Sequence, residues 1–181
     1  MEKEISGVRI QCIKGDITAQ GDMDAVVNAA NAELMPGGGV AGAIHRAAGP
    51  GLAEECTSLA PIKPGEAVIT GAHHLPNRYV IHCLGPVYGV DKPEEKLLAN
   101  CYRNALKRSE EKGIRSVAFP AISTGAFGYP LEEAAQVALR TVMKEAPSLR
   151  FVKIIRFVLF STRDYAVFEE ILAQLASGEH V

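Results

Sequence analysis

The sequence predicts an α/β fold: a three-layer α/β/α sandwich with a mixed, mostly parallel central sheet of about six strands. Short β-branched, apolar runs alternate along the chain with longer segments of helical periodicity, as in strands joined by helical crossovers. The middle runs are apolar throughout, which is typical of strands covered on both faces. Residues 67–73 and 78–85 lie too close together for a crossover helix, so we expect them to form an antiparallel hairpin.

Six runs have the composition of strands. In chain order they are residues 8–14, 24–30, 67–73, 78–85, 115–122 and 153–160. Five further segments place apolar residues at helical spacing. In chain order these helices are expected at residues 39–48, 51–59, 94–112, 131–145 and 164–176. Pro93 stands at the expected first position of the third helix and Gly113 just past its end, as helix termini favour. Only the two ends of the chain are expected to fray.

The length and composition predict one domain over residues 1–181. No cofactor is expected. The net charge of -2 lacks the positive surplus of a nucleic-acid binder, so any anionic ligand must be held locally. No apolar run approaches the roughly 20 residues that cross a bilayer, and the opening "MEKEISG" lacks an apolar leader core. We therefore expect a cytoplasmic protein without a membrane partner. The four cysteines lack metal-ligand spacing, so neither zinc nor a disulfide framework is expected.

Two glycine-containing loops each follow a predicted strand and precede a predicted helix. The first contains Gly37, Gly38 and Gly39, and the second is "STGAFGYP", residues 123–130. Glycines let the backbone approach a ligand, and a helix start offers free N–H groups with partial positive charge. Two such loops at one edge of a sheet predict a clamp on a diphosphate. A tight turn with close strand–helix packing is the alternative for the first loop alone.

Other glycine motifs fit less well. Neither loop carries the Gly-Lys-Ser/Thr sequence of a Walker loop, which argues against ATP hydrolysis. Gly37, Gly39 and Gly42 do match the dinucleotide-binding pattern G-x-G-x-x-G. That pattern also needs a short turn after the strand and an acidic residue at the end of the next strand. Here six residues, 31–36, intervene, and Glu54 and Glu55 fall within a helical segment, so we interpret the match as accidental.

With both loops in place, the sequence resembles the macrodomain family, whose members bind ADP-ribose. The resemblance rests on five segments that occur in family order and span nearly the whole chain. They are "KGDIT" (14–18), "VVNAANAELMPGGGVAGAIHRAAG" (26–49), "GEAVITGAHHLPNRYVIHCLGPVY" (65–88), "SVAFPAISTGAFGYP" (116–130) and "FVLF" (157–160). The chain resembles the branch with Ala after the Gly-Gly-Gly-Val run.

The resemblance implies roles for individual residues. Asp16 would accept the adenine amino group, and Ile17 would offer its backbone N–H to the pyrophosphate. Asn31 would bind the distal ribose, whereas Asn28 would be structural and would tie the first loop together. Phe160 would stack on adenine; as a lone residue it also fits a core position. The remaining ligand-binding residues would lie along the two phosphate loops: Gly38, Gly39, Val40 and Ala41 on the first, and Ser123, Thr124, Gly125, Ala126 and Phe127 on the second.

Catalysis is less clearly implied than binding. Family members with strong removal activity carry Asp where this chain has Ala41. His45 lies on the same helix face as Ala41 and would relay a proton or orient water, or else is a packed structural histidine. A second route uses the bound diphosphate to polarise water, with Phe127 and Gly125 shaping its approach. The candidate catalytic residues are therefore His45, Asn31 and Phe127.

These roles favour a protein that binds ADP-ribose and mono-ADP-ribosylated proteins and slowly hydrolyses ADP-ribosyl esters. The esters would be mono-ADP-ribosyl Glu or Asp, or O-acetyl or phosphoryl ADP-ribose, as for a mono-ADP-ribosyl hydrolase, deacetylase or ADP-ribose phosphatase. Three alternatives stay open: a non-catalytic reader of ADP-ribose, a module that binds RNA or poly-adenylate, and a nicotinamide-dependent dehydrogenase. The absence of a basic stripe counts against RNA.

Overall fold

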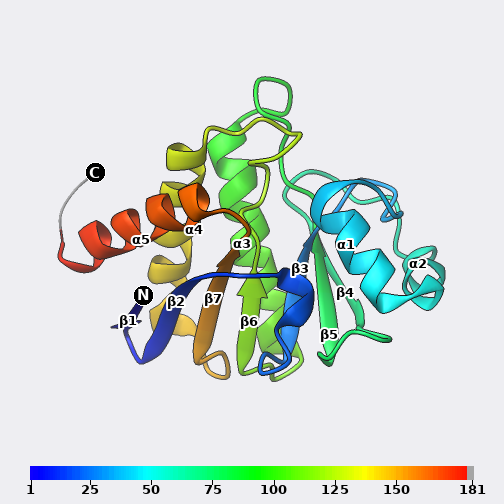
Figure 1. The fold of residues 1–181 in the computed structure, drawn as a ribbon, viewed down its shortest axis with the longest axis horizontal. Coiled ribbons are helices and arrows are strands. Elements are labelled where there is room, and N and C mark those ends of the chain that lie inside the picture. Colours follow the sequence, from blue (N-terminus) through cyan, green and yellow to red (C-terminus); the bar gives the residue numbers. More distant parts are fainter. Residues whose placement is uncertain (179–181) are drawn as a thin grey trace.

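The structure, a computed structural model, describes residues 1–178. Its centre is a sheet of seven strands in the order β1-β2-β7-β6-β3-β5-β4 (Figure 1). The strands are β1 (Glu2–Ile5), β2 (Val8–Lys14), β3 (Ala25–Ala29), β4 (Ala67–Gly71), β5 (Tyr79–Cys83), β6 (Ser116–Phe119) and β7 (Ile154–Leu159). The five central strands are parallel, and β1 and β4 pair antiparallel at the two edges. The predicted mixed sheet and its β4–β5 hairpin are confirmed.

The sheet has one strand more than predicted, because the N-terminal segment forms β1 rather than fraying. Glu2–Ile5 carries no run of apolar residues, and most of its side chains are exposed, so hydropathy could not reveal it. Backbone pairing with β2 forms the strand, with Glu2 opposite Gln11 and Ile5 opposite Val8. Ser6 and Gly7 make the two-residue turn with positive φ angles of 51° and 80°, as this hairpin geometry requires. The C-terminal residues 179–181 lie outside the described part of the chain.

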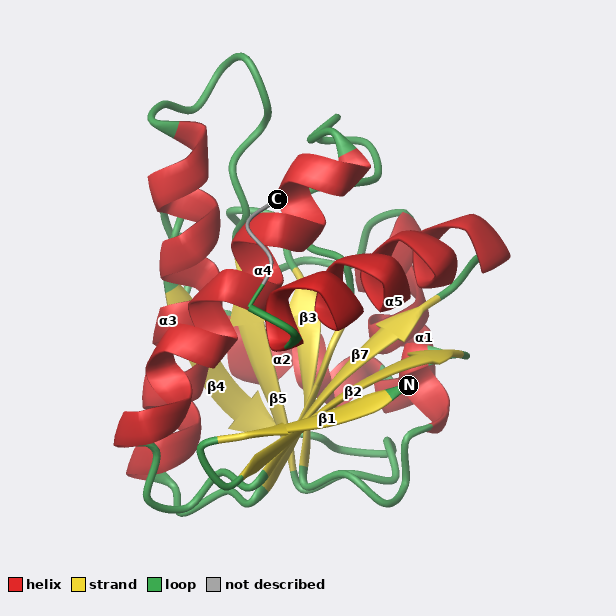
Figure 2. Cartoon of the chain, turned by 90° about the vertical axis from the view of Figure 1, so that its left-hand side faces the viewer, coloured by secondary structure: helices red, strands yellow, loops and turns green. Residues whose placement is uncertain are grey.

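Helices cover both faces of the sheet. They are α1 (Gly39–Ala48), α2 (Pro50–Cys56), α3 (Glu94–Glu111), α4 (Leu131–Glu145) and α5 (Thr162–Ala176), with short 3-10 turns η1 (Ile17–Ala19) and η2 (Ala146–Ser148). Helices α1 and α2 pack on one face and α3, α4 and α5 on the other. Figure 2, which views the molecule at right angles to Figure 1, shows the strands fanning apart with the twist of the sheet. The predicted three layers are confirmed.

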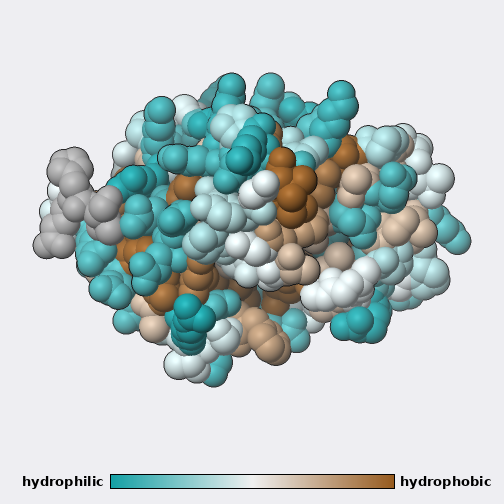
Figure 3. Space-filling model, turned by 90° about the horizontal axis from the view of Figure 1, so that it is seen from above, coloured by the Kyte–Doolittle hydropathy of each residue, from teal (hydrophilic) through white to brown (hydrophobic). Residues whose placement is uncertain are grey.

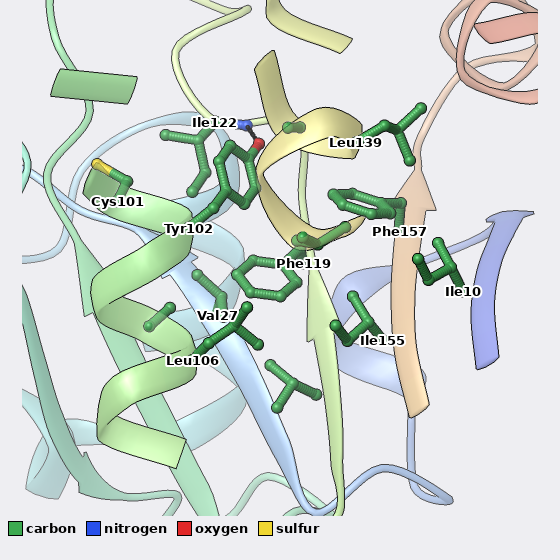
Figure 4. Packing of buried hydrophobic residues seen from close by; sticks show 14 of the residues in the cluster. Ile10, Val27, Cys101, Tyr102, Leu106, Phe119, Ile122, Leu139, Ile155 and Phe157 are labelled. Atoms are coloured by element: carbon green, nitrogen blue, oxygen red, sulfur yellow. Dashed lines mark hydrogen bonds between the residues drawn. The ribbon is translucent and has the colours of Figure 1, made fainter. Parts of the chain in front are cut away.

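The larger part of the core lies between the sheet and α3, α4 and α5 (Figure 4). Phe119 and Phe157 stack with their ring centroids 5.7 Å apart, and the ring of Tyr102 lies 5.2 Å from that of Phe119. All three side chains are fully buried. The Tyr102 hydroxyl accepts a hydrogen bond of 3.2 Å from the Ile122 N–H, so the aromatic core also fixes the chain just beyond β6.

The four cysteines are free thiols in the interior. Burial raises the pKa of the Cys12 thiol to about 12 and that of the Cys56 thiol to about 11, which keeps both protonated. Among residues 1–178, no helix combines the length and apolar character needed to cross a membrane. In the same residues, no group of three or more His, Cys, Asp or Glu side chains is arranged to hold a metal ion.

Candidate functional site

Two loops meet at the carboxyl ends of the parallel strands. The first loop (residues 30–38) joins β3 to α1, and the second loop (residues 120–130) joins β6 to α4. Strands β3 and β6 pair directly, so the two loops leave the sheet side by side, as the sequence predicts. Figure 3 looks down on this edge, where pale and hydrophobic residues cross the middle between hydrophilic rims. Ligands of open α/β sheets bind at such an edge.

The first loop leads directly into the start of α1. Gly38 caps this helix without any side-chain hydrogen bond, and Gly39 has a φ of +55°. A Cβ atom on Gly38 or on Gly39 would meet no atom within 4 Å, so the backbone is open to a ligand at both. The first N–H groups of a helix have no partner inside it, and Gly42 is the first residue of α1 to donate, to the Gly38 carbonyl. The amides of Gly39, Val40 and Ala41 therefore stay available to an anion.

Asn31 closes the first loop on itself. Its Oδ1 accepts from the Met35 N–H at 3.1 Å, and its Nδ2 donates to the Met35 carbonyl at 2.8 Å. The side chain is only partly buried. The residue predicted to bind a ribose is thus also the residue that ties the loop, a role that the sequence reasoning gave to Asn28. Contact with a ribose remains a prediction for Asn31.

The second loop also offers free amides. Within residues 1–178, the N–H groups of Gly125, Ala126 and Phe127 make no hydrogen bond, whereas Gly128 donates to the Gly125 carbonyl at 3.0 Å. Gly125 and Ala126 are exposed. This loop therefore presents three adjacent donors at the edge where α1 begins, which suits a diphosphate.

Ser123 and Thr124 use their hydroxyls inside the protein. The Ser123 hydroxyl is buried and donates to the Pro86 carbonyl at 2.8 Å, and the Thr124 hydroxyl donates to the Ala121 carbonyl at 2.9 Å. Both residues lie in the second loop, and their predicted place beside a phosphate remains a prediction. Their hydroxyl hydrogens, however, are already engaged with the backbone.

A carboxylate lies at the far end of the same edge. Asp16 caps η1, and its Oδ1 accepts from the Thr18 hydroxyl at 2.7 Å and the Thr18 N–H at 2.8 Å. These hydrogen bonds, the hydroxyl's first, lower the pKa of Asp16, so the exposed carboxyl is ionised near neutral pH. Within residues 1–178, Asp16 Oδ2 and the Ile17 N–H make no hydrogen bond. Both can therefore take a ligand.

An exposed aromatic ring stands beside this carboxylate. The Gly15 N–H donates to the Leu159 carbonyl at 2.9 Å, which brings Asp16 and Phe160 to neighbouring strand ends. Phe160 is 86% exposed, which excludes the alternative of a core phenylalanine. A phenyl ring with this exposure next to an acceptor is suited to stacking on a planar, amino-bearing base.

Two histidines are buried where α1 packs on the sheet, His45 on α1 itself and His82 on β5. The rings of His45 and His82 are both buried, with centroids 6.5 Å apart. Asn28 Nδ2 lies 3.1 Å from His82 Nδ1; an amide nitrogen only donates, so the ring proton of neutral His82 is on Nε2, 3.0 Å from the Thr70 hydroxyl. That hydroxyl donates to the Gly71 carbonyl. Asn28 thus has a structural place, linking β3 to β5.

Burial governs the ionisation of both rings. It lowers the pKa of His45, and burial together with the nearby His45 lowers the pKa of His82 to about 3. Neither ring nitrogen of His45 makes a hydrogen bond within residues 1–178, so the ring has no backbone partner there. A catalytic role for His45 remains a prediction, and the ring is neutral near physiological pH.

Sequence reasoning missed three supports of this site: Thr18, which donates to Asp16; the Gly85–Pro86 segment, which contacts the second loop; and Tyr102, which accepts from Ile122. The role of Thr18 could have been predicted from the local sequence, because an Asp two residues before a Thr is typical of a capped turn. The other two join residues that lie far apart in the chain. No local pattern could have paired them.

Comparisons with known proteins agree on one family. The family model described as "Macro domain" matches residues 27–138. A macro domain-containing protein of Chlorobaculum tepidum is 50% identical over 167 residues, covering 92% of this chain and 96% of its own. The Oceanobacillus iheyensis macrodomain with ADP is 41% identical with a TM-score of 0.94, over 98% of this chain and 97% of that one. The Trypanosoma brucei macrodomain in complex with ADP-ribose is 37% identical with a TM-score of 0.82, over 89% and 68%.

Proposed function

The chain belongs to the macrodomain family, and on that premise we propose that it binds ADP-ribose, free or attached to proteins, and slowly hydrolyses ADP-ribosyl esters. One observation carries the proposal. Free backbone amides at the start of α1 and on the second loop face a common strand edge, with Asp16 and Phe160 at the end of the same edge. Solved relatives with ADP and with ADP-ribose support it.

The diphosphate would lie between the two loops. Amides of residues 39–41 and 125–127, together with the Ile17 N–H, would donate to its oxygens, helped by the partial positive charge at the start of α1. Backbone dipoles alone would hold the two negative charges of the diphosphate. The site therefore needs no surplus of Lys and Arg, which agrees with the net charge of -2.

The base would lie at the other end. Asp16 Oδ2 would accept from the exocyclic amino group of adenine, and Phe160 would stack on the ring. An amino group distinguishes adenine from purines that carry a carbonyl there, because a carboxylate repels a carbonyl oxygen. The distal ribose would then lie beside the first loop and Phe127, with its anomeric carbon directed outward.

Ester hydrolysis at that carbon needs little help from the protein. A water oxygen would bond to the anomeric carbon, the bond from that carbon to the ester oxygen would break, and the carboxylate would leave with the electron pair. The water proton would pass through a diphosphate oxygen to solvent. Ala41 supplies no carboxylate and His45 is buried and neutral, so we expect slow turnover.

Two measurements test the proposal. Calorimetric titration with ADP-ribose should show one site, and adenosine should bind far more weakly because it lacks the diphosphate. Incubation with a protein carrying glutamate-linked ADP-ribose should release free ADP-ribose above the chemical background. Absence of binding would refute the proposal as a whole, and absence of release would remove only its enzymatic part.

A non-catalytic reader is the second candidate, and the burial of His45 favours it. A reader would bind the modified protein and protect the ester from spontaneous hydrolysis. His45→Ala would then leave the affinity for ADP-ribose unchanged. The same release assay separates the two functions, because a reader lowers the rate below background whereas a hydrolase raises it.

A further inference from the structure

We propose that Ser123 is a positioning residue, whose buried hydroxyl holds the second loop in the shape that leaves its amides free for a diphosphate. The inference rests on the proposed function. It assigns Ser123 a role other than contact with ligand, because its hydroxyl donates to the Pro86 carbonyl at 2.8 Å and its side chain is 6% exposed.

The backbone of Ser123 adopts a conformation that serine seldom takes. Its φ is +68°, in the left-handed region that favours glycine. Glycine at this position would relieve the strain but would lose the hydroxyl. A strained residue persists where the surrounding structure fixes it, and here the bond to Pro86 is part of what fixes it.

Gly85 makes the bond to Pro86 possible. This glycine is buried, and a Cβ atom added to it would overlap the Ser123 hydroxyl and would lie 2.6 Å from Ile122 Cγ2. Real Cβ atoms do not come so close to other atoms, so no other residue fits without moving the loop. The chain just beyond β5 is thus shaped to receive the serine side chain.

Three further hydrogen bonds, each donated by a backbone N–H, hold the rest of the second loop around Ser123. Ile122 donates to the Tyr102 hydroxyl at 3.2 Å, Tyr129 donates to the Ser123 carbonyl at 2.9 Å, and Tyr88 donates to the Phe127 carbonyl at 2.9 Å. The contacts lie before, at and beyond Ser123. The three free amides of the loop lie between the anchored points, so their direction depends on those anchors.

The decisive variant is Ser123→Gly. Glycine accepts a φ of +68° without strain, so the substitution removes the hydroxyl and little else. We expect the affinity for ADP-ribose to fall about tenfold, the usual effect of one buried hydrogen bond. Adenosine, which has the base and a ribose but no phosphate, should bind as before. That difference is a readout which general loss of stability would not produce.

Ser109→Ala is the matched control. Ser109 is also buried and donates to a backbone carbonyl, that of Ala105, at 2.8 Å, but it lies in α3 away from the loops. We expect it to lower the thermal midpoint without changing the affinity for ADP-ribose. Unchanged affinity in Ser123→Gly, equal losses for adenosine and ADP-ribose, or an equal loss in Ser109→Ala would each overturn the inference. Absence of ADP-ribose binding by the unsubstituted protein would instead overturn the proposed function.

A second pair of variants tests the contact with Gly85. Gly85→Ala should impair binding more than Ser123→Gly, because the new methyl group displaces the serine side chain. Adding Ser123→Gly to it should restore part of the loss, since only the contact with Ile122 remains. If Gly85→Ala fails to fold, recovery of folded protein in the double variant serves as the readout. A double variant no better than Gly85→Ala would contradict the assigned contact.

Discussion

The two loops that meet at the strand ends are stabilised in different ways. The first loop is closed by a side chain of its own, Asn31, bonded to the backbone of Met35, and its bonds to distant segments join backbone groups only, from Ala30 to the Cys83 carbonyl and from Ile62 to the Ala32 carbonyl. The second loop is held by segments distant in sequence, through Ser123 to Pro86 and Phe127 to Tyr88. The side-chain bond that closes the first loop can be predicted from local sequence, whereas the side-chain bond that holds the second loop depends on the completed fold.

The interiors beneath the two loops differ as well. Under α1, which follows the first loop, lies a polar chain of Asn28, His82 and Thr70. Under the second loop lie aromatic rings, with Tyr102 reaching Ile122. Because burial lowers the pKa of His45 and of His82, we expect acid to act on the polar side. Four predictions follow the contrast, from the largest expected effect to the smallest.

Gly39→Glu should nearly abolish binding through the first loop. The substitution forces a non-glycine residue to a φ of +55° and sets a carboxylate against the diphosphate at the start of α1. We expect a loss of affinity of about a hundredfold or more, measured by calorimetry. Gly113→Glu is the matched control, since Gly113 has a φ of +66° and equally open space but lies at the far end of α3. Near-normal affinity in Gly39→Glu would show that the first loop is misassigned.

Acid should lower the free energy of unfolding through the buried polar side of the molecule. Burial lowers the pKa of His82 from 6.5 to about 3, so the unfolded chain takes up a proton on this ring at a higher pH than the folded chain does. The free energy of unfolding should therefore fall as the pH drops through this window, by about 1.4 kcal/mol per unit from this ring. Burial lowers the pKa of His45 and adds to the same slope.

Denaturant unfolding at several pH values in that window measures the slope. His82→Gln should flatten it, because glutamine can hydrogen-bond but does not titrate. A slope that is unchanged in His82→Gln would mean that other groups, and not this ring, make the fold sensitive to acid.

Asn31→Ala should loosen the first loop without disturbing the second. The variant loses both bonds to Met35 and any bond to the distal ribose, and we expect a loss of roughly 1 to 3 kcal/mol in the binding of ADP-ribose. Comparing ADP-ribose with ADP, which lacks the distal ribose, separates the two contributions. Equal losses for both ligands would mean that Asn31 acts only by closing the loop.

Phe160→Ala should weaken the binding of the adenine base without disturbing either loop. Removing the ring should cost about 1 kcal/mol of binding, near the low end for a base stacked on an aromatic side chain. The thermal midpoint should not change, because the ring is 86% exposed. Phe151→Ala, before the opposite end of β7, should leave the affinity intact. An unchanged affinity in Phe160→Ala would argue against stacking.

Much of the fold could be predicted because its units are local. Apolar runs mark the central strands, and glycines between a strand and a helix mark both loops. The edge strand β1 could not be predicted, since pairing with β2 rather than hydropathy defines it. In the site, the free amides follow from the loop pattern, but the orientation of Ser123 depends on Pro86, 37 residues earlier in the chain. The burial of His45 likewise depends on how α1 packs on the sheet.

The charged edge strand β1 affects behaviour at high concentration. Without it, the edge of β2 would offer unpaired amides and carbonyls to a neighbouring molecule, a template for intermolecular sheet growth. Glu2, Lys3 and Glu4 instead present exposed charges along that border. Truncation of these few residues is therefore expected to promote precipitation long before it alters ligand recognition.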